Sequence, residues 1–510
     1  MSFPSDLITS LGVKVTRLVT DSRIVAPGDT FVAYPGGTAD GRQFIGQAIA
    51  NGANAVIWEA HGFSWNKEWQ LPNLAVTDLR HHAGEIADHV YGNPSQKLWI
   101  VGITGTNGKT SCCHWIAQSL CALGKKAALI GTLGNGFYPD LQPTLNTTPD
   151  AIRVHELFAD YLAHDAQAIA MEVSSHALEQ GRVNGVQFDV ALLTNLSRDH
   201  LDFHGNMQSY AAAKRRLFDW QQLKYAVLNL DDTFGAELAE QLRDTGVEVV
   251  GYGLNDDALA LAERLGLRMV YGGALHMDVH GFRTQIHSSW GSGNLQGRLI
   301  GRFNVSNLLG VMAVLLVTGI PFNHALRKLS GIGAVPGRMQ TLGNGIGCPT
   351  VVVDYAHTPD ALEKVLYAVR NIIGHESVEN CDRKLICVFG CGGNRDRGKR
   401  PMMGAIAAKL ADIVIITSDN PRGEEPLDII AAIVSGITSE QRTANSTYQI
   451  IEDRATAITQ AVLDAHAADV ILIAGKGHET YQEIKGVKYP FSDADVAQHA
   501  LFAWRNEVRT

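Results

Sequence analysis

A glycine-rich loop that carries a lysine lies between an apolar run and a helical segment in WIVGITGTNGKTS, residues 99–111. Gly105 and Gly108 let backbone N–H groups turn toward a phosphate, and the N-terminus of the following helix adds partial positive charge. Lys109 is placed to reach the β- and γ-phosphates of a nucleotide, and the Thr110 hydroxyl to bind Mg²⁺. A strict phosphate-loop motif would begin with glycine where this chain has isoleucine. A coincidental Gly-Lys-Thr is the alternative, but context and spacing favour an ATP site.

Polar residues with metal-ligand chemistry follow two other apolar runs. Glu172 ends the run in AMEVSSH, and a carboxylate beside a phosphate loop is a natural Mg²⁺ ligand, although such a residue alone is more often a helix cap. Asp199, His200 and His204 cluster in TNLSRDHLDFHG, where we expect His204 to be only hydrogen-bonded. Lys214 lies in the helical stretch SYAAAKRRLF, and composition alone predicts a solvated side chain there.

The Gly-Thr-Asn-Gly-Lys-Thr loop, with the motifs that follow it in order, resembles the Mur ligase superfamily, which includes cell-wall amino-acid ligases and folylpolyglutamate synthetase. The resemblance implies amide-bond formation, in which ATP turns a carboxylate into an acyl phosphate that an amine attacks. It implies nucleotide contacts that a closing C-terminal domain completes: Gly105, Thr106, Asn107, Gly108, Lys109, Thr110, Ser111, Asn304, Arg338 and His357. For Asn304, helix N-capping is the alternative.

The resemblance also implies the phosphoryl-transfer site. The expected catalytic residues are Lys109, His200 and Lys214, and the expected metal ligands are Thr110, Glu172, His200 and Lys214. In this family the lysine at the position of Lys214 is carbamylated, which converts a cation into an anionic ligand. That reaction requires a neutral amine, and burial lowers the pKa of a lysine. Mg²⁺ held there neutralises charge as the γ-phosphoryl group moves.

Three polar stretches resemble the family's site for a uridine-nucleotide sugar peptide: residues 20–42, 145–150 and 174–182. The implied contacts are Thr20, Ser22, Gly37, Thr38, Ala39, Asn146, Thr147, Thr148, Ser174, Gln180 and Arg182. Where relatives often have His-Gln before the alanine, this chain has Gly37-Thr38, so the backbone contacts can persist but the side-chain contacts of those relatives are not expected. A polar, cationic set suits an anionic sugar peptide.

The stretch SDNPRGEEP, residues 418–426, matches the Asp-Asn-Pro-Arg motif of family members that add meso-diaminopimelate. Diaminopimelate differs from lysine by a second carboxylate, and Arg422 offers a planar fork for it. In isolation the motif would be a surface β-turn. The resemblance assigns this amino acid to Arg395, Asp419, Asn420, Pro421, Arg422, Gly475 and Glu479. Among these, Glu479 would hold an ammonium group.

Apolar, β-branched runs that end in Gly, Asn, Asp or Thr must position all of these groups. They cover residues 98–105, 168–175, 189–197, 225–232, 350–357, 385–393, 412–421 and 469–478. Continuous runs are typical of strands buried on both faces, and helix-period segments such as 113–126 and 401–411 separate them. The alternation predicts α/β domains with parallel sheets, whose ligands bind beyond the carboxyl ends of the strands.

The length of 510 residues suggests about three domains, at roughly 150 residues each. We predict a UDP-sugar-binding domain at residues 1–97 and a central domain with a P-loop ATPase-like parallel sheet at 98–336. A Rossmann-like α/β domain at 337–510 would bind the incoming amino acid.

The composition of the chain limits which kinds of molecule the protein is expected to bind. A net charge of −9 argues against a nucleic-acid binder, and no apolar run approaches the ~20 residues of a membrane helix. The N-terminus shows no signal peptide. Seven cysteines without metal-ligand pairs suit a reducing cytoplasm, and Cys112 and Cys113 are expected to be packing residues in a helix. We expect a cytoplasmic monomer that acts on small molecules.

Together the motifs predict an enzyme of peptidoglycan synthesis, and hence of cell-wall biogenesis, cell shape and division. It would use ATP and Mg²⁺ to add meso-diaminopimelate to the D-glutamate γ-carboxylate of UDP-N-acetylmuramoyl-L-alanyl-D-glutamate. A lysine-adding ligase is the first alternative, disfavoured by Arg422. Folylpolyglutamate synthetase, a P-loop motor or regulatory ATPase, and a non-catalytic binding protein leave more of the motifs unexplained.

Overall fold

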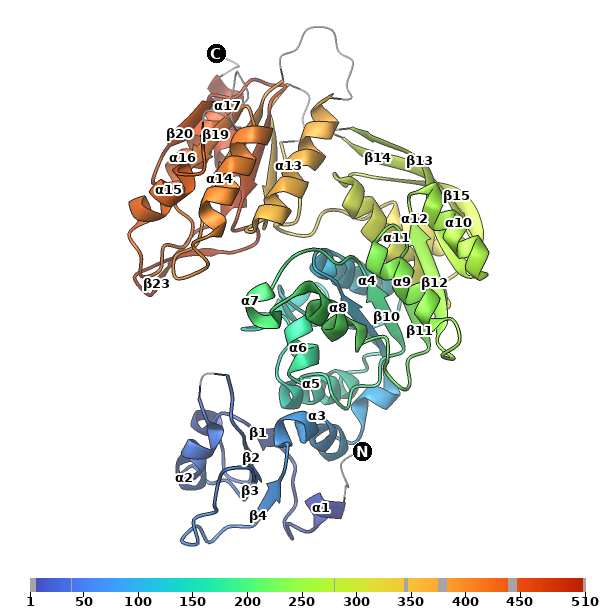
Figure 1. The fold of residues 1–510 in the computed structure, drawn as a ribbon, viewed down its shortest axis with the longest axis vertical. Coiled ribbons are helices and arrows are strands. Elements are labelled where there is room, and N and C mark those ends of the chain that lie inside the picture. Colours follow the sequence, from blue (N-terminus) through green and yellow to red (C-terminus); the bar gives the residue numbers. More distant parts are fainter. Residues whose placement is uncertain are drawn as a thin grey trace. The chain divides into compact units, whose positions relative to one another are not determined.

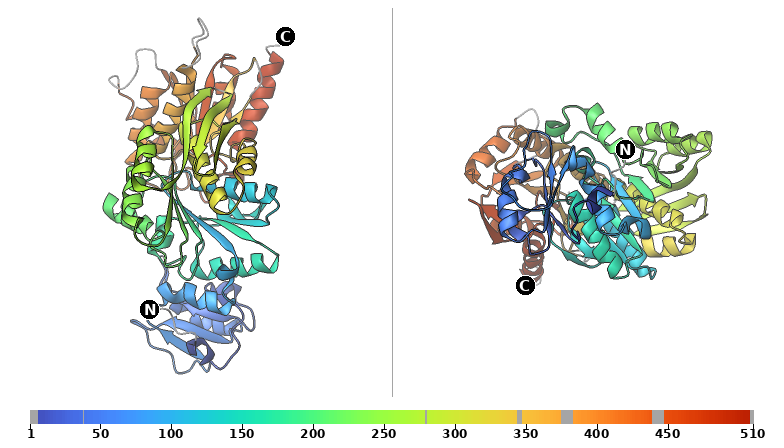
Figure 2. Two further views of the ribbon diagram at one scale, coloured as in Figure 1. Left: turned by 90° about the vertical axis from the view of Figure 1, so that its right-hand side faces the viewer. Right: turned by 90° about the horizontal axis from the view of Figure 1, so that it is seen from below.

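The structure, a computed structural model, describes residues 6–37, 39–278, 280–343, 347–374, 383–438 and 447–507. Figures 1 and 2 show the helices and strands of the chain. The chain divides into two compact units. The first holds residues 1–271, 288–290 and 309–325, and the second holds 272–287, 291–308 and 326–510.

The N-terminal sheet has four parallel strands in the order β1-β2-β3-β4 (Figure 1). They are β1 (Leu18–Val19), β2 (Thr30–Ala33), β3 (Ala55–Glu59) and β4 (Asn73–Val76). Helices α1 (Asp6–Thr9) and α3 (Leu79–Val90) pack on one face and α2 (Ile45–Ala50) on the other. Three short 3-10 helices connect these elements: η1 (Ser22–Ile24), η2 (Gly41–Phe44) and η3 (Pro94–Lys97). Both faces of the sheet are therefore apolar. In β2, for example, Val32 packs into the hydrophobic core on one face, and Phe31 and Ala33 pack into the core on the other.

The central sheet has the strand order β15-β14-β13-β12-β11-β10-β5-β9-β6-β7-β8. Its strands are β5 (Trp99–Thr104), β6 (Ala127–Gly131), β7 (Gly134–Phe137), β8 (Asp140–Gln142), β9 (Ala168–Glu172), β10 (Val190–Leu193), β11 (Tyr225–Asn229), β12 (Glu248–Gly253), β13 (Arg268–Asp278), β14 (Gly281–Ser288) and β15 (Gly291–Gly297). Pairing is parallel from β13 through β6, which confirms the predicted parallel sheet. The sequence did not predict the antiparallel strands β7 and β8 at one edge.

Helices connect and cover these strands: α4 (Lys109–Ala122), α5 (Ala151–Ala163), α6 (Ser175–Glu179), α7 (Leu201–His204), α8 (Met207–Arg215), α9 (Thr233–Leu242), α10 (Asp256–Leu265), α11 (Arg302–Val317) and α12 (Phe322–Leu329). Helices α5, α9 and α10 pack their apolar sides into one large core cluster with the strands. Asp150, Asn206 and Asp232 cap α5, α8 and α9, because each side chain accepts a first-turn N–H.

The C-terminal sheet has the order β16-β17-β21-β18-β19-β20, parallel except for β16. Its strands are β16 (Gln340–Leu342), β17 (Thr350–Asp354), β18 (Leu385–Phe389), β19 (Ile413–Ile416), β20 (Thr447–Ile450) and β21 (Val470–Ala474). Helices α13 (Pro359–Gly374), α14 (Lys399–Leu410) and α15 (Pro426–Val434) cover one face, and α16 (Arg454–Leu463) and α17 (Asp493–Glu507) the other. This doubly covered parallel sheet is the predicted Rossmann-like arrangement. A hairpin of β22 (Tyr481–Ile484) and β23 (Val487–Pro490) follows β21.

Other expectations have mixed outcomes. Cys112 and Cys113 are buried within α4, as expected, and the described cysteines are free thiols. Within the described residues, no helix has the length and apolar character needed to span a bilayer. The three sheets lie inside the segments 1–97, 98–336 and 337–510, whose exact limits stay a prediction.

Candidate functional site

The phosphate loop lies between β5 and α4, as predicted. Gly105 has φ 148° and Gly108 has φ 87°, backbone conformations that favour glycine. A Cβ on Gly105 would lie 1.9 Å from the Thr194 hydroxyl, so no other residue fits there. Thr194 Oγ1 donates to the Asn107 carbonyl at 2.6 Å, and Thr106 Oγ1 donates to the carbonyl of Ser197 at 3.1 Å. The loop is therefore fixed by side chains and backbone from the end of β10.

Two lysines meet at this loop. Lys109 Nζ donates to the carbonyl oxygens of Gly105 and Thr106 at 2.7 and 2.8 Å. Lys214 Nζ donates to the same Gly105 oxygen at 2.8 Å and lies 4.5 Å from the Tyr210 ring centroid. Lys214 is 1% exposed, so the composition-based expectation of a solvated side chain is wrong. Burial, and then the positive charge of Lys109, lower the pKa of Lys214 well below its ordinary value.

Glu172 is buried at the end of β9 and gathers hydroxyl and N–H donors. Thr110 Oγ1 donates to Glu172 Oε2 at 3.0 Å, and Thr132 donates its N–H to Oε1 at 2.7 Å and its hydroxyl to Oε2 at 3.2 Å. The helix-cap alternative is wrong, because Ser174 is the residue that caps α6. A hydrogen bond from Thr110 thus joins the start of α4, directly after the phosphate loop, to Glu172, the carboxylate predicted to bind the metal ion.

Three histidines cluster beside these residues. The His176 ring centroid is 4.8 Å from that of His200 and 5.6 Å from that of His204. Burial first, and then His200 and His204, lower the pKa of His176 to about 4. His204 Nε2 lies 3.0 Å from Ser175 Oγ, which confirms its expected hydrogen-bonding role. His200 has φ 53° and its ring lies 3.4 Å from the carboxylate of Asp199.

The oxygen atoms beside the phosphate loop fit a Mg²⁺ ion that is also bound by the phosphates of a nucleotide. Among the described residues, no group of three or more His, Cys, Asp or Glu side chains is arranged to hold a metal ion. The Thr110 hydroxyl and the buried Glu172 carboxylate are nevertheless hard-oxygen donors beside a phosphate loop. Mg²⁺ is commonly bound by one or two protein oxygens, substrate phosphates and water.

Four of the residues expected to contact the sugar peptide form a chain of hydrogen bonds that starts at Glu172. Thr148 Oγ1 donates to the Glu172 carbonyl at 2.8 Å and lies 3.4 Å from Ser174 Oγ. Arg182 Nη1 donates to the Thr148 carbonyl at 2.9 Å, while Nε and Nη2 donate to Gln180 Oε1 at 2.9 and 2.7 Å. The structure brings these predicted residues together in one network.

The other predicted substrate residues lie between β8 and α5 or in the segments that follow β1 and β2. Thr147 Oγ1 lies 3.0 Å from Thr132 Oγ1, and Asn146 is exposed. Ser22 is buried and donates to Gln47 Oε1 at 2.8 Å. The remaining predicted residues are Thr20, half-buried after β1, the exposed Gly37 and Ala39, and Thr38, which lies outside the described residues.

Three predicted nucleotide contacts belong to the second unit. Asn304 lies inside α11 rather than before it, and its Nδ2 donates to the Ile300 carbonyl at 2.8 Å, so the N-cap alternative is wrong. The Arg338 guanidinium lies 4.4 Å from the Tyr355 ring centroid. His357 is exposed and its Nδ1 lies 2.9 Å from the Tyr355 carbonyl. Arg338 and His357 thus contact the same tyrosine.

The Asp-Asn-Pro-Arg motif follows β19 and contacts the loop after β21. Asn420 Nδ2 donates to Glu479 Oε2 at 2.8 Å, and the fully buried Lys476 donates to Asn420 Oδ1 at 3.0 Å and Glu479 Oε2 at 2.9 Å. Gly475 has φ 115°, and a Cβ there would lie 2.6 Å from Asp419 Oδ2. Hydrogen bonds therefore join the two predicted parts of the amino-acid site, the Asp-Asn-Pro-Arg motif and the loop after β21.

Arg422 adopts a left-handed backbone conformation with φ 52°. Its Nη1 donates to the Gly393 carbonyl at 2.9 Å, and its Nε lies 3.2 Å from the Glu483 carboxylate. A Cβ on Gly393 would lie 1.9 Å from the Pro421 carbonyl oxygen. Because Gly392 and Gly393 have no side chains, the loop after β18 can contact the Asp-Asn-Pro-Arg motif closely.

Glu424 fastens the loop that carries Arg395. It accepts hydrogen bonds from buried Arg400 at 2.9 and 3.0 Å and from the Asn394 N–H at 2.6 Å. The hydrogen bonds from Arg400 first, and then that from the Asn394 N–H, lower the pKa of Glu424 to about 2. Arg395 itself is exposed.

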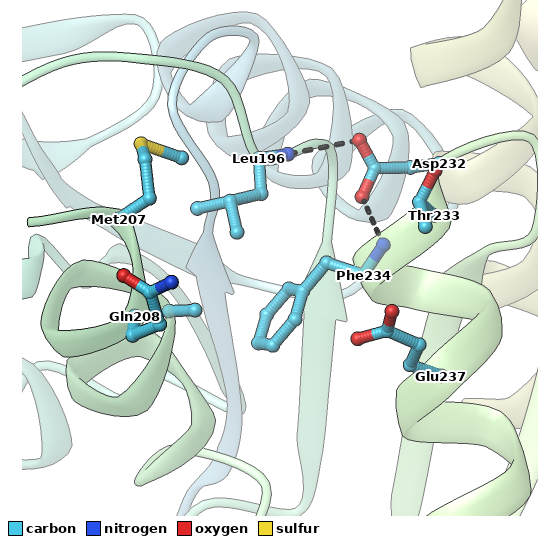
Figure 3. A pocket seen from close by; sticks show the side chains of 8 residues that line it. Leu196, Met207, Gln208, Asp232, Thr233, Phe234 and Glu237 are labelled. Carbon is cyan, nitrogen blue, oxygen red and sulfur yellow. Dashed lines mark hydrogen bonds between the residues drawn. The ribbon is translucent and has the colours of Figure 1, made fainter.

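A pocket of about 290 Å³ lies between α8 and the start of α9, outside the predicted site (Figure 3). Its wall consists of Leu196, Met207, Gln208, Ala211, Asp232, Thr233, Phe234 and Glu237. The Asp232 carboxylate at its rim accepts the N–H groups of Leu196 and Phe234 (Figure 3). None of the residues predicted from the sequence lines this pocket.

Sequence reasoning missed several residues of these networks: Thr132, His176, Lys476 and Glu483. Lys476 stands between Gly475 and Glu479, two residues that the resemblance assigned to the amino-acid site, and that position was a usable signal. Thr132 and Glu483 carry no local signal, because their partners lie far away in the sequence.

Comparisons with known proteins cover most of the chain. The Mur ligase family, catalytic domain, matches residues 14–91, the Mur ligase middle domain matches 103–315, and the Mur ligase glutamate ligase domain matches 337–477. A protein of Nitrosomonas europaea named UDP-N-acetylmuramoyl-L-alanyl-D-glutamate--2,6-diaminopimelate ligase is 49% identical over 97% of this chain and 94% of its own. A protein of Neisseria meningitidis serogroup A with the same name is 47% identical over 95% and 94%.

A solved structure of a UDP-N-acetylmuramoyl-L-alanyl-D-glutamate--2,6-diaminopimelate ligase matches with a TM-score of 0.68 and 35% identity, covering 96% of this chain and 95% of the other. Sequence motifs, family models and fold agree over nearly the full length. The chain belongs to the Mur ligase family.

Proposed function

We propose that this Mur ligase uses ATP to join meso-diaminopimelate to the D-glutamate γ-carboxylate of UDP-N-acetylmuramoyl-L-alanyl-D-glutamate. The observation that carries the proposal is the arrangement around Arg422, whose guanidinium is oriented by Gly393 and Glu483 beside Asn420. A fixed cationic fork suits the second carboxylate of diaminopimelate, which lysine lacks. The names of the relatives from Nitrosomonas and Neisseria support the same substrate.

In the first half-reaction, an oxygen of the γ-carboxylate attacks the γ-phosphorus of ATP, and the bond to the ADP oxygen breaks. Lys109 exchanges the carbonyls of Gly105 and Thr106 for phosphate oxygens and stabilises their charge. Thr110 and Glu172 would hold Mg²⁺, which supplies charge neutralisation to the phosphates when bound. His200, at the edge of this group, is assigned as a further ligand through its place in the family motif.

Lys214 is proposed to act as its carbamate. The neutral Nζ attacks CO₂, a nitrogen–carbon bond forms and one proton is released, which leaves an anion. Burial of Lys214 and its shared acceptor with Lys109 support this assignment, because both favour the neutral amine. A carbamate there would balance the charge of Lys109 and offer an oxygen ligand to a metal ion.

In the second half-reaction, an amine of diaminopimelate attacks the acyl carbon. The new carbon–nitrogen bond forms, the nitrogen loses a proton, and the tetrahedral intermediate expels phosphate. Arg422 would hold the far carboxylate, and Glu479, oriented by Lys476 and Asn420, the ammonium group. Because one chain supplies all of the assigned residues, we propose that a cytoplasmic monomer is sufficient.

The test is phosphate release by the purified enzyme with ATP, Mg²⁺ and the UDP-linked sugar dipeptide, with meso-diaminopimelate, L-lysine or no amine added. We expect release that requires both the sugar dipeptide and diaminopimelate. Equal rates with L-lysine would favour the lysine-adding alternative. Release without either substrate would favour a regulatory ATPase.

A further inference from the structure

Hydrogen bonds connect β22, the first strand of the β22–β23 hairpin, and the turn after it to the Asp-Asn-Pro-Arg motif. Gln482 Nε2 donates to the Asp419 carbonyl at 2.7 Å. The Arg422 N–H donates to the Glu483 carbonyl at 3.0 Å, and the Lys485 N–H donates to the Arg422 carbonyl at 2.6 Å. These bonds hold the motif against β22. They also stabilise the left-handed conformation of Arg422, which is unfavourable for a non-glycine residue.

Glu483 contacts the motif through its backbone and its side chain at once. Its N–H donates to Asn420 Oδ1 at 2.9 Å, and its carbonyl accepts the Arg422 N–H. Its carboxylate lies 3.2 Å from Arg422 Nε. One residue outside the motif is therefore linked to two of the motif's residues.

The guanidinium of Arg422 has a defined orientation as a result. Nε lies 3.2 Å from the Glu483 carboxylate, Nη1 donates to the Gly393 carbonyl, and Nη2 has no hydrogen-bond partner among the described residues. The side chains of Arg422 and Glu483 are 22% and 25% exposed, so solvent screens this pair less than a surface pair. Two of the three nitrogens are fixed by protein, which leaves the Nη2 side for a ligand carboxylate.

We infer that Glu483 is a positioning and specificity residue for the incoming amino acid, acting through Arg422. This inference rests on the proposed function, in which Arg422 recognises the second carboxylate of diaminopimelate. An arginine side chain loses several rotatable bonds of freedom when it binds a ligand. The ion pair with Glu483 restrains the side chain before the substrate arrives, so less entropy is lost on binding.

The opposite role for Glu483 makes a different prediction. If its carboxylate competed with the substrate carboxylate for the guanidinium, removal of its charge would strengthen binding. Geometry argues against competition, because Glu483 is on the Nε side and Nη2 stays available. The sign of the change in KM therefore separates positioning from competition.

The experiment compares Glu483→Gln and Glu483→Ala with the unaltered enzyme in steady-state kinetics. Glutamine keeps the shape and the backbone bonds but removes the charge. We expect KM for meso-diaminopimelate to rise about 10-fold in Glu483→Ala and less in Glu483→Gln. We expect kcat and the KM values for ATP and the sugar dipeptide to change less than about 2-fold. An unchanged or lower KM for diaminopimelate would overturn the inference.

The matched control is Glu425→Gln, which removes the same charge from an exposed pair with Lys485 of the same hairpin. Its kinetics should equal those of the unaltered enzyme. Thermal unfolding of each variant checks that the domain is folded. A variant that fails to fold would be replaced by Glu483→Asp, for which a partial rise in KM is expected.

A double-mutant cycle with Arg422→Ala separates this inference from the proposed function. If Glu483 acts through Arg422, adding Glu483→Gln to Arg422→Ala should change kcat/KM for diaminopimelate less than about 2-fold. Additive effects would contradict the inference while leaving the function intact. If Arg422→Ala alone leaves KM for diaminopimelate unchanged, the assignment of Arg422 in the proposed function fails instead.

Discussion

Lys109 and Lys214 donate hydrogen bonds to one and the same acceptor, the carbonyl oxygen of Gly105, at 2.7 and 2.8 Å. Two full positive charges at one buried carbonyl repel each other, so the fully buried lysine is the one that favours the neutral state. For Lys109, at the phosphate loop, we propose the role of a cation that binds phosphate. We therefore propose two different roles for these lysines: Lys214 as a neutral amine that can be modified, and Lys109 as a cation.

Replacement of Lys214 tests its modification. We expect Lys214→Ala to lower kcat at least about 100-fold, because it removes a preorganised charge from the phosphoryl-transfer site. Added formate or acetate should restore part of the activity by occupying the space of the carbamate. Native mass spectrometry of the unaltered enzyme should show the added mass of one CO₂, which acid removes. Lys364→Ala, at an exposed pair with Asp360, serves as the control. An unmodified mass combined with no rescue would contradict the assignment.

Replacement of Glu172 tests the metal site. In Glu172→Gln, an amide NH₂ group replaces a carboxylate oxygen that accepts bonds from Thr110 or Thr132. We expect the Mg²⁺ concentration for half-maximal activity to rise at least about 10-fold. We also expect the unfolding free energy to fall by about 1–3 kcal/mol, because buried donors lose their acceptor. Glu179→Gln, in an exposed pair with Arg216, should show neither effect. An unchanged Mg²⁺ dependence would remove Glu172 from the ligand set.

Replacement of Arg422 tests recognition of the amino acid. Lysine keeps the charge but lacks the planar fork, so Arg422→Lys should raise KM for meso-diaminopimelate about 30-fold or more. The KM for ATP should stay within about 2-fold, since Arg422 is proposed to contact only the amino acid. Steady-state kinetics with each substrate varied in turn measure both values. Near-normal diaminopimelate kinetics in this variant would exclude Arg422 as the carboxylate ligand.

The Glu424–Arg400 contact predicts a pH dependence of stability. The pKa of Glu424 is lowered from 4.5 to about 2, so between these values the unfolded chain binds more protons than the folded one. The stabilisation is therefore fully present above pH 4.5 and is lost as the pH falls toward 2. We expect Glu424→Gln to be less stable than the unaltered protein at pH 7, with a difference that shrinks below pH 4.5. Denaturant unfolding at several pH values measures this; a difference independent of pH would refute it.

Local spacing alone was sufficient for much of the fold and the site. Continuous apolar runs predicted β5, β9, β10 and β11 and, in the C-terminal sheet, β17, β18, β19 and β21, because a strand buried on both faces needs apolar residues at every position. The edge strands β16 and β20 have no such run and were not predicted. The loop before α4 was equally predictable, since its glycines, lysine and threonine act within one turn of chain. The Asp-Asn-Pro-Arg motif was recognised only through the family resemblance, because in isolation it predicts a surface β-turn.

Burial and long-range partners could not be predicted from local sequence. Lys214 has the composition of a solvated helix, yet it is buried against a carbonyl 109 positions earlier. Asn304 has the residue type of a cap, yet it lies inside α11. Glu483 contacts Arg422 only because β22 pairs with the motif.

The sequence by itself determined which chemical groups this protein contains and the order in which they follow buried strands. The tertiary structure decided which of them share a partner, which are removed from water and in which direction each points. The physical reason is that the pKa of Lys214 and the orientation of Arg422 depend on desolvation and on distant neighbours. Both are set when separate segments pack together, and neither is encoded in the spacing of a motif.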